Sequence, residues 1–372
     1  MLQRPTVKPT VHVMVATPSA ATGQGGVDRV MATLKAQLAR EDRPEVRAQF
    51  VASRGAGSVL LSPFYALFFC LRMIAARLRG RVDVVHINLA SDGSTYRKLV
   101  IANCARLMTI PYVLHLHGAE YQEFWEGAGR LLSRSIENMF ERAAQVVVLG
   151  SVWREFIAGR APGVADKITI IANATGVPAL AQRGGGESVH ILFLGRIGER
   201  KGVPQLLAAL SAMAEDDRWR ATVAGDGSVD AARNQSASLG LSQRVAFPGW
   251  VGPTEVAQLI ASADILVLPS FAENLPVSVI EGMAAGLAVV ATPVGAVTDI
   301  IVDEKTGLLV PPGDVGALAL ALNRLVSDPE LRAELGKNAR MFHRQQLDLA
   351  PFAQAICEVW IAAARTKIAG EK

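Results

Sequence analysis

Residues 264–293, DILVLPSFAENLPVSVIEGMAAGLAVVATP, contain the pattern that decides the fold of this chain. DILVLP and AVVATP, at the two ends, are short apolar runs of the kind found in parallel strands that are buried on both faces. Between them a helix is expected from Pro276, a residue that suits the first position of a helix. A strand, a helix and a second strand in this order predict an α/β protein built on a parallel sheet.

The same alternation of strand and helix continues on both sides of this stretch. Strands are expected at 11–16, 83–89, 112–117, 145–150 and 167–173, and then at 190–195, 220–225, 244–249, 264–269 and 288–293. The Gly/Pro-rich stretch ATGVPALAQRGGGE separates the two sets and is typical of a linker. We therefore expect two Rossmann-like domains, each a doubly wound parallel sheet, that face each other across a cleft lined by the carboxyl ends of their strands.

Length and composition fit two globular domains. The chain has 372 residues, of which 50% are hydrophobic, so each domain can bury a core of its own. We expect an N-terminal domain at 1–173, a linker at 174–187, a C-terminal domain at 188–350, and a final helix at 351–372 that packs back toward the first domain. Three widely spaced cysteines, and an opening MLQRPTVKPT without signal-peptide features, favour the cytoplasm.

Charge is distributed unevenly along the chain. The net charge is +4, but the residues up to 182 carry 21 basic and 13 acidic side chains, whereas the remainder carry 17 and 21. This imbalance indicates an anionic partner for the first domain. VLLSPFYALFFCLRMIAARLRGR, at 59–81, favours a membrane over a nucleic acid, because an apolar aromatic run is joined there to Arg72, Arg77, Arg79 and Arg81. The segment either lies in the interface of an anionic membrane or forms a core helix with a basic end.

Two loops at predicted strand ends have the composition of phosphate-binding loops. After the first strand, Gly23, Gly25 and Gly26 precede a helix, where backbone N–H groups can approach a phosphate, although a tight turn also needs glycine. In the second domain, LFLGRIGERKGVPQLL places Arg196 at a strand end and Lys201 where the next helix begins. Two cations there could neutralise a diphosphate; the alternative is a solvated charged loop.

Two histidines and two glutamates are further candidates for ligand binding. His115 and His117 of YVLHLHGAE share one face of a strand, and His117, nearer the carboxyl end, should reach the cleft. Glu273 follows the strand at 264–269, where open α/β sheets bind ligands; the alternative is an ordinary exposed loop residue. Glu281 lies in an almost wholly apolar helix and needs hydrogen-bond donors, unless the helix is shallow enough for the carboxylate to reach water.

Taken together, these residues resemble the retaining GT-B glycosyltransferases of glycosyltransferase family 4, also called glycosyl transferases group 1. The resemblance rests on Glu273 and Glu281, which are separated by seven residues, on GRIGERKG upstream, on GGVDRV in the first domain and on HLHG between. It covers nearly the whole chain. It implies transfer of a hexose from a nucleotide-diphosphate sugar to a glycan or lipid-linked acceptor, with retention and without a metal ion or cofactor.

The resemblance also implies a role for each residue. Glu281 would accept hydrogen bonds from ribose hydroxyls, Glu273 would hold hydroxyls of the donor sugar, and His117 would contact that sugar near the reacting carbon. Arg196 and Lys201 would stabilise the departing diphosphate. The other donor-binding residues implied are Gly25 and Gly26 at the phosphates, Asn274, Leu275 and Pro276 at sugar and phosphate, and Gly225, Gly227, Trp250 and Val251 near the base.

The chain departs from the family pattern at two places. Asn274, Leu275 and Pro276 stand where many members have Gly-Phe-Gly, and NATGVPAL stands where many have an Asn-Gly-Val-Asp run. Two other functions stay open: a GT-B sugar-nucleotide epimerase or hydrolase, and a non-catalytic subunit of a polysaccharide assembly complex. The expected setting is bacterial-type polysaccharide or glycolipid synthesis in the cytoplasm, either away from the membrane or peripheral on the inner face of the plasma membrane.

Overall fold

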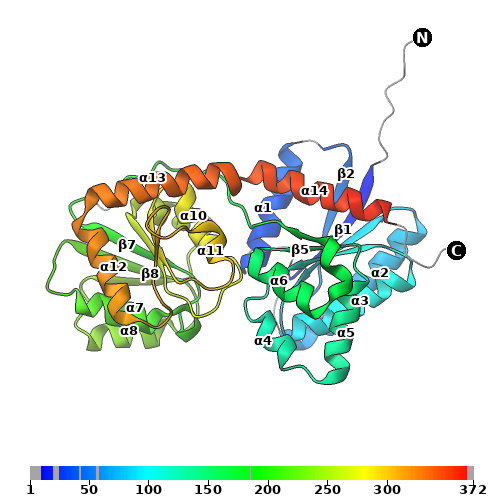
Figure 1. Cartoon of the computed structure of the whole chain (residues 1–372), viewed down its shortest axis with the longest axis horizontal. Helices are drawn as coiled ribbons and strands as arrows, with labels where there is room; N and C mark the ends of the chain where they lie inside the picture. The colour runs from blue at the N-terminus through cyan, green and yellow to red at the C-terminus, as the bar shows by residue number, and fades with distance from the viewer. Residues whose placement is uncertain (1–9, 20–24, 42, 56–57, 185, 367–372) are drawn as a thin grey trace, which may run out of the picture. The chain divides into compact units, whose positions relative to one another are not determined.

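The structure is a computed structural model, and it describes residues 10–19, 25–41, 43–55, 58–184 and 186–366. The chain divides into two compact units, whose elements are labelled in Figure 1. Unit 1 is Met1–Ala172 together with Leu349–Lys372, and unit 2 is Asn173–Asp348. The expected linker at 174–187 thus belongs to unit 2 by its contacts.

Unit 1 contains a six-stranded sheet in which every strand runs parallel to its neighbours. In the order β2-β1-β3-β4-β5-β6, the strands are Val46–Ala52, Val11–Thr17, Val84–Leu89, Tyr112–Leu116, Gln145–Val148 and Ile168–Ile170. β3 and β4 are buried along their whole length, as expected for strands with helices on both faces. The order reverses between β1 and β3, and the carboxyl ends of these strands therefore mark the topological switch point of the sheet.

β2 and the two-residue β12 (Leu308–Leu309) are absent from the strands expected above. β2 lies at the edge of its sheet, and its exposed Arg47 and Gln49 interrupt the apolar run. Alternation of buried and exposed residues is typical of a strand with one solvated face, and it gives a weaker signal in a short window than a continuous apolar run.

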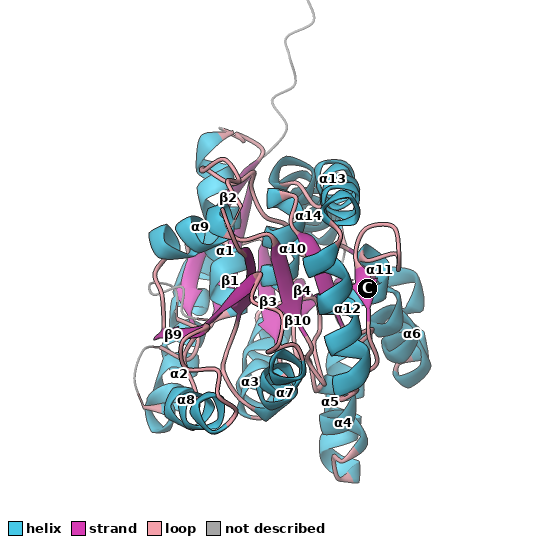
Figure 2. Cartoon of the chain, turned by 90° about the vertical axis from the view of Figure 1, so that its left-hand side faces the viewer, coloured by secondary structure: helices cyan, strands magenta, loops and turns pink. Residues whose placement is uncertain are grey.

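Helices flank the strands of unit 1 (Figure 2). They are α1 (Gly26–Arg40), α2 (Ser62–Leu78), α3 (Gly93–Leu107), α4 (Tyr121–Glu126), α5 (Arg130–Glu141), α6 (Ser151–Arg160) and α14 (Leu349–Arg365), with 3-10 turns η1 (Val59–Leu61) and η2 (Pro162–Lys167). α14 comes from the far end of the chain and packs on α1 and on strands β1, β3, β4 and β5. Its buried side chains include Phe352, Ile356 and Trp360. Of the helix expected at 351–372, residues 367–372 lie outside the described part.

The helical run Pro329–Arg365 contains a window long and apolar enough, by length and composition, to cross a membrane. It consists of two helices, α13 (Pro329–Gln346) and α14, which are separated by Leu347 and Asp348. The apolar side chains of α14 are buried in unit 1. We therefore assign this helix to the core of that unit.

Unit 2 contains a second six-stranded sheet, also parallel throughout. In the order β12-β11-β10-β7-β8-β9, its strands are Leu308–Leu309, Ala288–Ala291, Ile265–Leu268, Val189–Leu194, Trp219–Ala224 and Val245–Gly249. Its helices are η3 (Glu199–Lys201), α7 (Val203–Ala212), α8 (Val229–Ser238), α9 (Pro253–Ser262), α10 (Val277–Ala285), α11 (Val297–Ile300), α12 (Val315–Ser327) and α13. The order reverses between β7 and β10, which makes this the switch point of unit 2. Two doubly wound parallel sheets confirm the predicted fold class.

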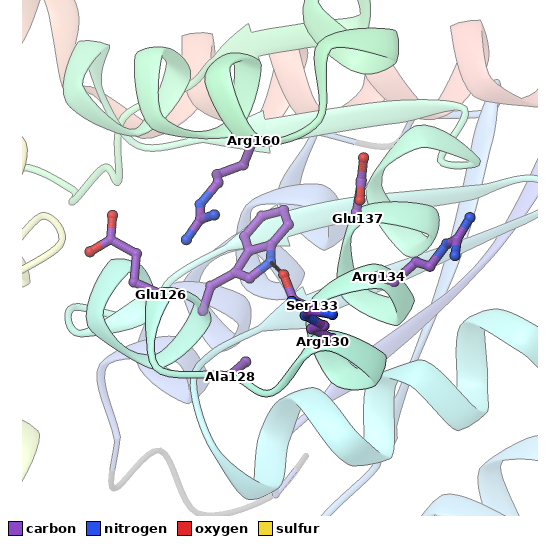
Figure 3. A pocket seen from close by; sticks show the side chains of 8 residues that line it. Glu126, Ala128, Arg130, Ser133, Arg134, Glu137 and Arg160 are labelled. Carbon is purple, nitrogen blue, oxygen red and sulfur yellow. Dashed lines mark hydrogen bonds between the residues drawn. The ribbon is translucent and has the colours of Figure 1, made fainter.

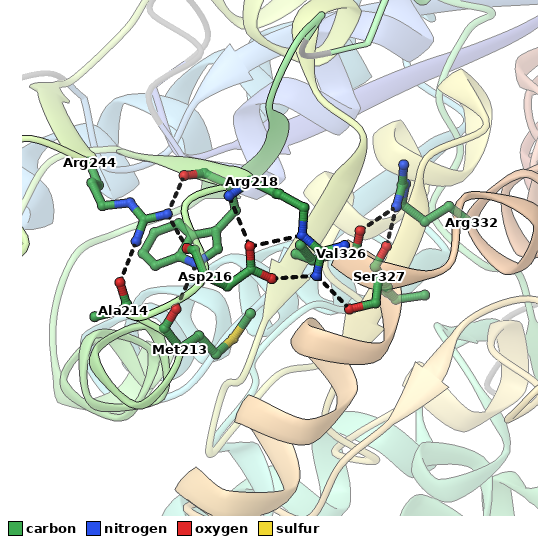
Figure 4. A network of polar contacts seen from close by, with 10 residues as sticks. Met213, Ala214, Asp216, Arg218, Arg244, Val326, Ser327 and Arg332 are labelled. Carbon is green, nitrogen blue, oxygen red and sulfur yellow. Dashed lines mark hydrogen bonds and ion pairs between the residues drawn. The ribbon is translucent and has the colours of Figure 1, made fainter.

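A polar network holds the amino end of β8 in unit 2 (Figure 4). The guanidinium of Arg244 lies 4.0 Å from the ring centroid of Trp219 and donates to the carbonyl oxygen of Trp219 at 3.1 Å. Arg218 donates to both carboxylate oxygens of Asp216, at 2.9 and 2.7 Å, and to Ser327 Oγ at 3.0 Å. These groups lie at the end of the strand opposite to the one where parallel sheets bind ligands, so we assign them a structural role.

Candidate active site

The loops that follow β7 and β10 lie against each other in unit 2. The two strands are neighbours in the sheet, with Ile265 opposite Ile191. The Phe271 N–H donates to the carbonyl oxygen of Arg200 at 2.8 Å, and Arg200 Nη1 donates to the carbonyl oxygen of Ala272 at 2.8 Å. These bonds hold the two loops together at the switch point of the sheet.

Lys201 and Glu273 form an ion pair across these loops. Glu273 is 7% exposed, and the side chain of Lys201 is 14% exposed. Glu273 Oε1 also accepts a hydrogen bond from Ser270 Oγ at 2.7 Å. Because burial removes the hydration of both charges, such a pair is weak evidence for stability. Its place at the ligand-binding edge of the sheet favours a functional role, and an ordinary exposed position for Glu273 is excluded.

Arg196, directly after β7, is exposed, and within the described ranges no ion pair joins it to a carboxylate. Its side chain lies instead beside the loop after β8, since a Cβ on Gly227 would be 3.1 Å from Arg196 Cγ. Gly225 and Gly227 have φ angles of 153° and 105°. A Cβ on Gly225 would lie 1.8 Å from the carbonyl oxygen of Gly195. Only glycine allows these two loops to lie so close together.

Trp250 and Val251 follow β9, the edge strand beside β8. Trp250 is 57% exposed, whereas Val251 is half-buried. The Gly225 N–H donates to the carbonyl oxygen of Gly249 at 2.8 Å, so the loops after β8 and β9 are joined. The exposed indole offers a flat apolar surface at this edge of unit 2.

Asn274, Leu275 and Pro276 are buried, and protein groups hold the first two carbonyl oxygens. The Ala296 N–H donates to Asn274 O at 2.7 Å, and Asn173 Nδ2 donates to Leu275 O at 2.9 Å. Asn173 is not among the residues expected at the site. It lies in the NATGVPAL segment, 102 residues before Leu275. No local sequence pattern predicts a contact over that separation.

Glu281 lies half-buried on α10, between the buried Ile280 and Gly282. A Cβ on Gly282 would be 2.8 Å from Leu266 Cδ2, so α10 packs directly on β10. α10 begins at Val277, and Pro276 precedes its first residue instead of occupying it. The helix is thus buried, as its apolar sequence predicts, and Glu281 Oε2 is buried with it.

In unit 1, Asn88 at the end of β3 orients His117, which directly follows β4. Asn88 Nδ2 donates to Ala16 O at 3.1 Å, which leaves Asn88 Oδ1 as an acceptor. His117 Nε2 lies 2.9 Å from that oxygen and therefore carries the proton that it donates. In a neutral imidazole this makes Nδ1 the acceptor nitrogen.

His117 belongs to a row of histidines. Its ring centroid is 4.0 Å from that of His115, as expected for two residues on one face of a strand. His115 Nδ1 lies 3.3 Å from His86 Nε2, and Trp360 Nε1 donates to His86 Nδ1 at 3.0 Å. Burial lowers the pKa of His86 to about 4 and that of His117 to about 3, and it lowers the pKa of His115 well below its usual value. All three rings are therefore neutral at pH 7.

The glycine loop after β1 is described from Gly25 onward, and Gly23 lies outside the described residues. α1 begins at Gly26, with no side chain capping that end. A Cβ on Gly25 or Gly26 meets no described atom within 4 Å. Close packing within the described part thus does not explain these two glycines, which favours the interpretation that they let a ligand approach the backbone.

A pocket of about 480 Å³ lies between α4, α5 and α6 of unit 1 (Figure 3). It is lined by Trp125, Glu126, Ala128, Arg130, Ser133, Arg134, Glu137 and Arg160. Trp125 is 1% exposed, and its Nε1 donates to Ser133 Oγ at 3.1 Å. None of the site residues expected from the sequence lines this pocket, and we do not assign it to the donor sugar.

Comparisons with known proteins identify the family. The model for Glycosyl transferases group 1 matches residues 181–342, and the model for the Glycosyl transferase 4-like domain matches residues 7–174. In fold, the chain is similar to the sucrose-phosphate synthase of Thermosynechococcus elongatus, with a TM-score of 0.79, 19% identity and coverage of 95% of this chain and 98% of that one. The chain is a GT-B glycosyltransferase of the family 4 type.

Two further proteins are similar to this glycosyltransferase. HepE of Anabaena, solved in complex with UDP and glucose, has a TM-score of 0.74 and 20% identity, with 94% of this chain and 98% of that chain covered. The 2-deoxystreptamine glucosyltransferase of Streptomyces kanamyceticus is 29% identical over 339 residues, which are 82% of this chain and 84% of that enzyme. The family resemblance read from the sequence is confirmed, and the glycosyltransferase takes its sugar from a nucleotide sugar.

The histidine row makes the stability of unit 1 depend on pH. His86 and His117 have folded-state pKa values of about 4 and about 3, so the unfolded chain, with ordinary values near 6.5, binds their protons first as the pH falls. Above the unfolded-state pKa of about 6.5, the two neutral histidines contribute fully to the free energy of unfolding. This contribution is lost as the pH falls toward their folded-state pKa values. We expect the free energy of unfolding by urea to decrease from about pH 6.5 to 5, and His117→Gln to reduce the slope by up to about 1.4 kcal/mol per pH unit.

His12→Gln is the control for this measurement, because His12 is half-buried in β1 and lies outside the row. It measures how far a histidine-to-glutamine change outside the row alters the slope. An identical slope in the wild type and in His117→Gln would show that His117 does not titrate as its burial requires.

Proposed function

We propose that the glycosyltransferase moves a hexose from a nucleoside-diphosphate sugar to an acceptor hydroxyl with retention of the anomeric configuration. The observation that carries this proposal is the buried Lys201–Glu273 pair at the switch point of unit 2. It supplies a cation for a leaving diphosphate and a carboxylate for sugar hydroxyls in one place. An epimerase or hydrolase would use the same donor site without an acceptor and is the second candidate.

Lys201 and Arg196 are the groups that would stabilise the leaving diphosphate. Negative charge develops on the diphosphate as the anomeric C–O bond breaks, and fixed cations stabilise that charge more in the transition state than in the ground state. Lys201 is held by Glu273 on the floor of the site, whereas the exposed Arg196 beside Gly227 can turn to meet the phosphates. These two cations would supply the charge that a metal ion provides in other transferases, and we propose that no metal is required.

Glu273 and His117 would position the donor sugar. Glu273 accepts from Ser270 and Lys201 through Oε1, which leaves Oε2 as the oxygen for a sugar hydroxyl. His117 offers its Nδ1 acceptor to another hydroxyl, and its pKa of about 3 makes it a weak base at neutral pH. We therefore assign His117 to hydrogen bonding and not to proton removal.

Other residues would bind the ribose, the base and the phosphates of the donor. Glu281, partly accessible on α10, would accept from ribose hydroxyls, and Trp250 and Val251 would lie against the base. Gly225 and Gly227 would keep the loops after β7 and β8 close together beside the base, and the loop at 274–276 would support sugar and phosphate. Gly25 and Gly26 would offer backbone N–H groups to a phosphate. Because HepE was solved with UDP, a UDP-sugar is the first donor to test.

Same-face attack accounts for retention. The acceptor oxygen would form its bond to the anomeric carbon on the face from which the diphosphate leaves, and the acceptor proton would pass to the leaving diphosphate oxygen. This route needs no carboxylate nucleophile beneath the sugar, in contrast to many retaining glycosidases. Glu273, engaged by Lys201 and Ser270, would keep its positioning role throughout.

Product analysis tests the function. The full chain is incubated with UDP- and GDP-hexoses and a panel of soluble and lipid-linked acceptors, with and without EDTA, and products are followed by mass and by the coupling constant of the anomeric proton. We expect a retained glycoside at an unchanged rate in EDTA. Release of free sugar or an epimerised nucleotide sugar alone would support the second candidate, and an inverted product or loss of activity in EDTA would contradict retention or metal independence.

Arg196→Ala and Lys201→Ala should each lower kcat by about 100-fold or more, as for loss of a preorganised charge contact. Lys337→Ala, an exposed lysine on α13, is the matched control and should leave kcat unchanged. Circular dichroism checks that each variant is folded. Unchanged turnover in both of the first two variants would remove these cations from the active site.

We also propose that unit 1 contacts an anionic membrane through α2 and η1. The segment at 59–81 is neither a core helix nor an exposed one, because it has two faces. Buried on one face are Ala66, Phe69, Cys70 and Met73. Exposed by about half or more on the other are Leu60, Leu61, Phe64, Leu67, Phe68, Leu71 and Leu78. Exposed apolar patches of this kind mark interaction sites, and the exposed Arg72, Arg79 and Arg81 favour an anionic lipid surface.

Flotation with vesicles tests the membrane contact. Binding to phosphatidylglycerol-rich vesicles should exceed binding to phosphatidylcholine vesicles and should weaken as salt is added. Replacing Arg72, Arg79 and Arg81 by glutamine should release the protein, since each base near an anionic surface contributes about 1 kcal/mol. Arg77 is retained because it donates to Met108 O and Thr109 Oγ1.

Leu71→Ser should also weaken vesicle binding, whereas Leu131→Ser, at an 87% exposed leucine on α5, is the matched control. Wild-type protein that stays unbound on anionic vesicles at low salt would contradict a membrane contact.

A further inference from the structure

The histidine row joins the last helix of unit 1 to the candidate site. At one end, Trp360 of α14 is fully buried, as are His86 of β3 and His115 of β4. At the other end, His117 is half-buried. Because Trp360 bonds to His86, the row lies on the face of the sheet that α14 covers. His117 is thus the member of the row that a ligand can reach.

Trp360 determines which nitrogen of His86 carries the proton. An indole N–H can only donate, and Trp360 Nε1 lies 3.0 Å from His86 Nδ1, which is therefore the acceptor. A charged imidazolium has no acceptor nitrogen, so this bond requires a neutral His86 with its proton on Nε2. Burial acts in the same direction, since it lowers the pKa of His86 to about 4.

The Nε2–H of His86 faces two acceptors. One is His115 Nδ1, at 3.3 Å, so the proton of His115 is on its Nε2. The other is the side chain of Asn88. Burial lowers the pKa of His86, and a hydrogen bond with Asn88 raises it in part, which means that the ring donates and the amide oxygen accepts. The same Asn88 Oδ1 accepts from His117 Nε2 at 2.9 Å. His86 therefore helps to turn the Asn88 oxygen toward His117.

Stability does not explain this row of buried polar rings. His115 Nε2 is buried and has no partner among the described residues. A buried N–H group without an acceptor destabilises the folded state, and apolar side chains at these positions would avoid that cost. The ring of His115 instead lies against that of His117, with centroids 4.0 Å apart and an angle of 39° between the planes. The row thus supports His117 both by packing and by hydrogen bonds.

We propose that Trp360 is a positioning residue: it fixes the tautomers of His86 and His115, and through them and Asn88 it holds His117 with Nδ1 free to accept from a donor-sugar hydroxyl. The chain segment that follows unit 2 in sequence thereby orders a ligand contact of unit 1. The effect on sugar binding rests on the proposed function, because that function assigns His117 to the sugar. The order of N–H groups along the row follows from the bonds alone.

Nuclear magnetic resonance of the full chain tests the tautomers, since long-range proton–nitrogen correlations of histidine rings show which nitrogen is protonated. In the wild type we expect the proton on Nε2 of His86, His115 and His117. Trp360→Phe keeps a buried ring but removes the N–H, and it should give mixed tautomers at His86 and His115. A wild-type His86 or His115 with its proton on Nδ1, or unchanged tautomers in Trp360→Phe, would overturn the proposal.

Trp219→Phe is the matched control for this measurement. Trp219 is 1% exposed, and its Nε1 donates to Met213 O at 3.0 Å, at the amino end of β8. The variant removes a buried indole N–H far along the chain from the row and should leave the histidine tautomers and the kinetics unchanged.

Kinetics test the positioning role. Trp360→Phe should raise the KM for the donor about tenfold with little change in kcat, because a misplaced His117 weakens a contact that binds the sugar before and during the reaction. A lower kcat at unchanged KM would indicate loss of folded enzyme and would overturn the role. In a His117→Ala background, Trp360→Phe should raise KM no further, and an additive effect would contradict action through His117.

Two substitutions of His86 repeat the test without changing Trp360. His86→Gln can accept from Trp360 through its oxygen and donate to His115 Nδ1 through its NH2 group, so it should keep the wild-type KM. His86→Leu can do neither and should raise KM as Trp360→Phe does. Equal KM values in these two variants would overturn the proposal. A wild type that transfers no sugar would contradict the proposed function, whereas mixed tautomers in Trp360→Phe would still support the order of the row.

Discussion

The reversal of strand order between β7 and β10 is the constraint on which the candidate active site depends. All strands of unit 2 end at one edge of the sheet, but the chain leaves these two neighbours toward opposite sides, and a ligand can enter where they diverge. The Phe271 N–H donates to Arg200 O and Arg200 Nη1 donates to Ala272 O, and these bonds hold together the two loops on which Lys201 and Glu273 pair. The pair places a cation and a carboxylate together at the ligand-binding edge of the sheet.

Unit 1 has a switch point of the same kind, but different side chains lie near it. Its strand order reverses between β1 and β3, and near that point lie two buried polar systems. Asn88 links Ala16 to His117 and fixes a neutral histidine as an acceptor, which suits sugar hydroxyls. Lys98, ten residues after Asn88, is buried and donates to Ser53 Oγ.

The sequence predicts those features that depend on local pattern. Continuous apolar runs identify ten strands correctly. β2 is missed because Arg47 and Gln49 give it the alternation of an edge strand, and β12 is missed because it has only two residues. Lys201 and Glu273 are recognisable since strand ends bind ligands, but their pairing and burial arise only when β7 and β10 become neighbours. The burial of Lys98 could not be predicted from the sequence, because it results from tertiary packing alone. Asn88 could have been found from the sequence, because it is a polar residue in the apolar run VVHINL. The contact between Asn173 and Leu275 could not, because no local pattern indicates it.

Hydrogen–deuterium exchange of the full chain, with and without saturating UDP and, in parallel, GDP, tests most directly whether the switch point of unit 2 is the nucleotide site. The contacts assigned to Lys201, Gly227 and Glu281 require slower exchange in peptides that cover 195–203, 225–228 and 270–282. Slower exchange in those three segments with either nucleotide is the expected result. Saturable binding that slows exchange only elsewhere, for example at the amino ends of the strands, would contradict it.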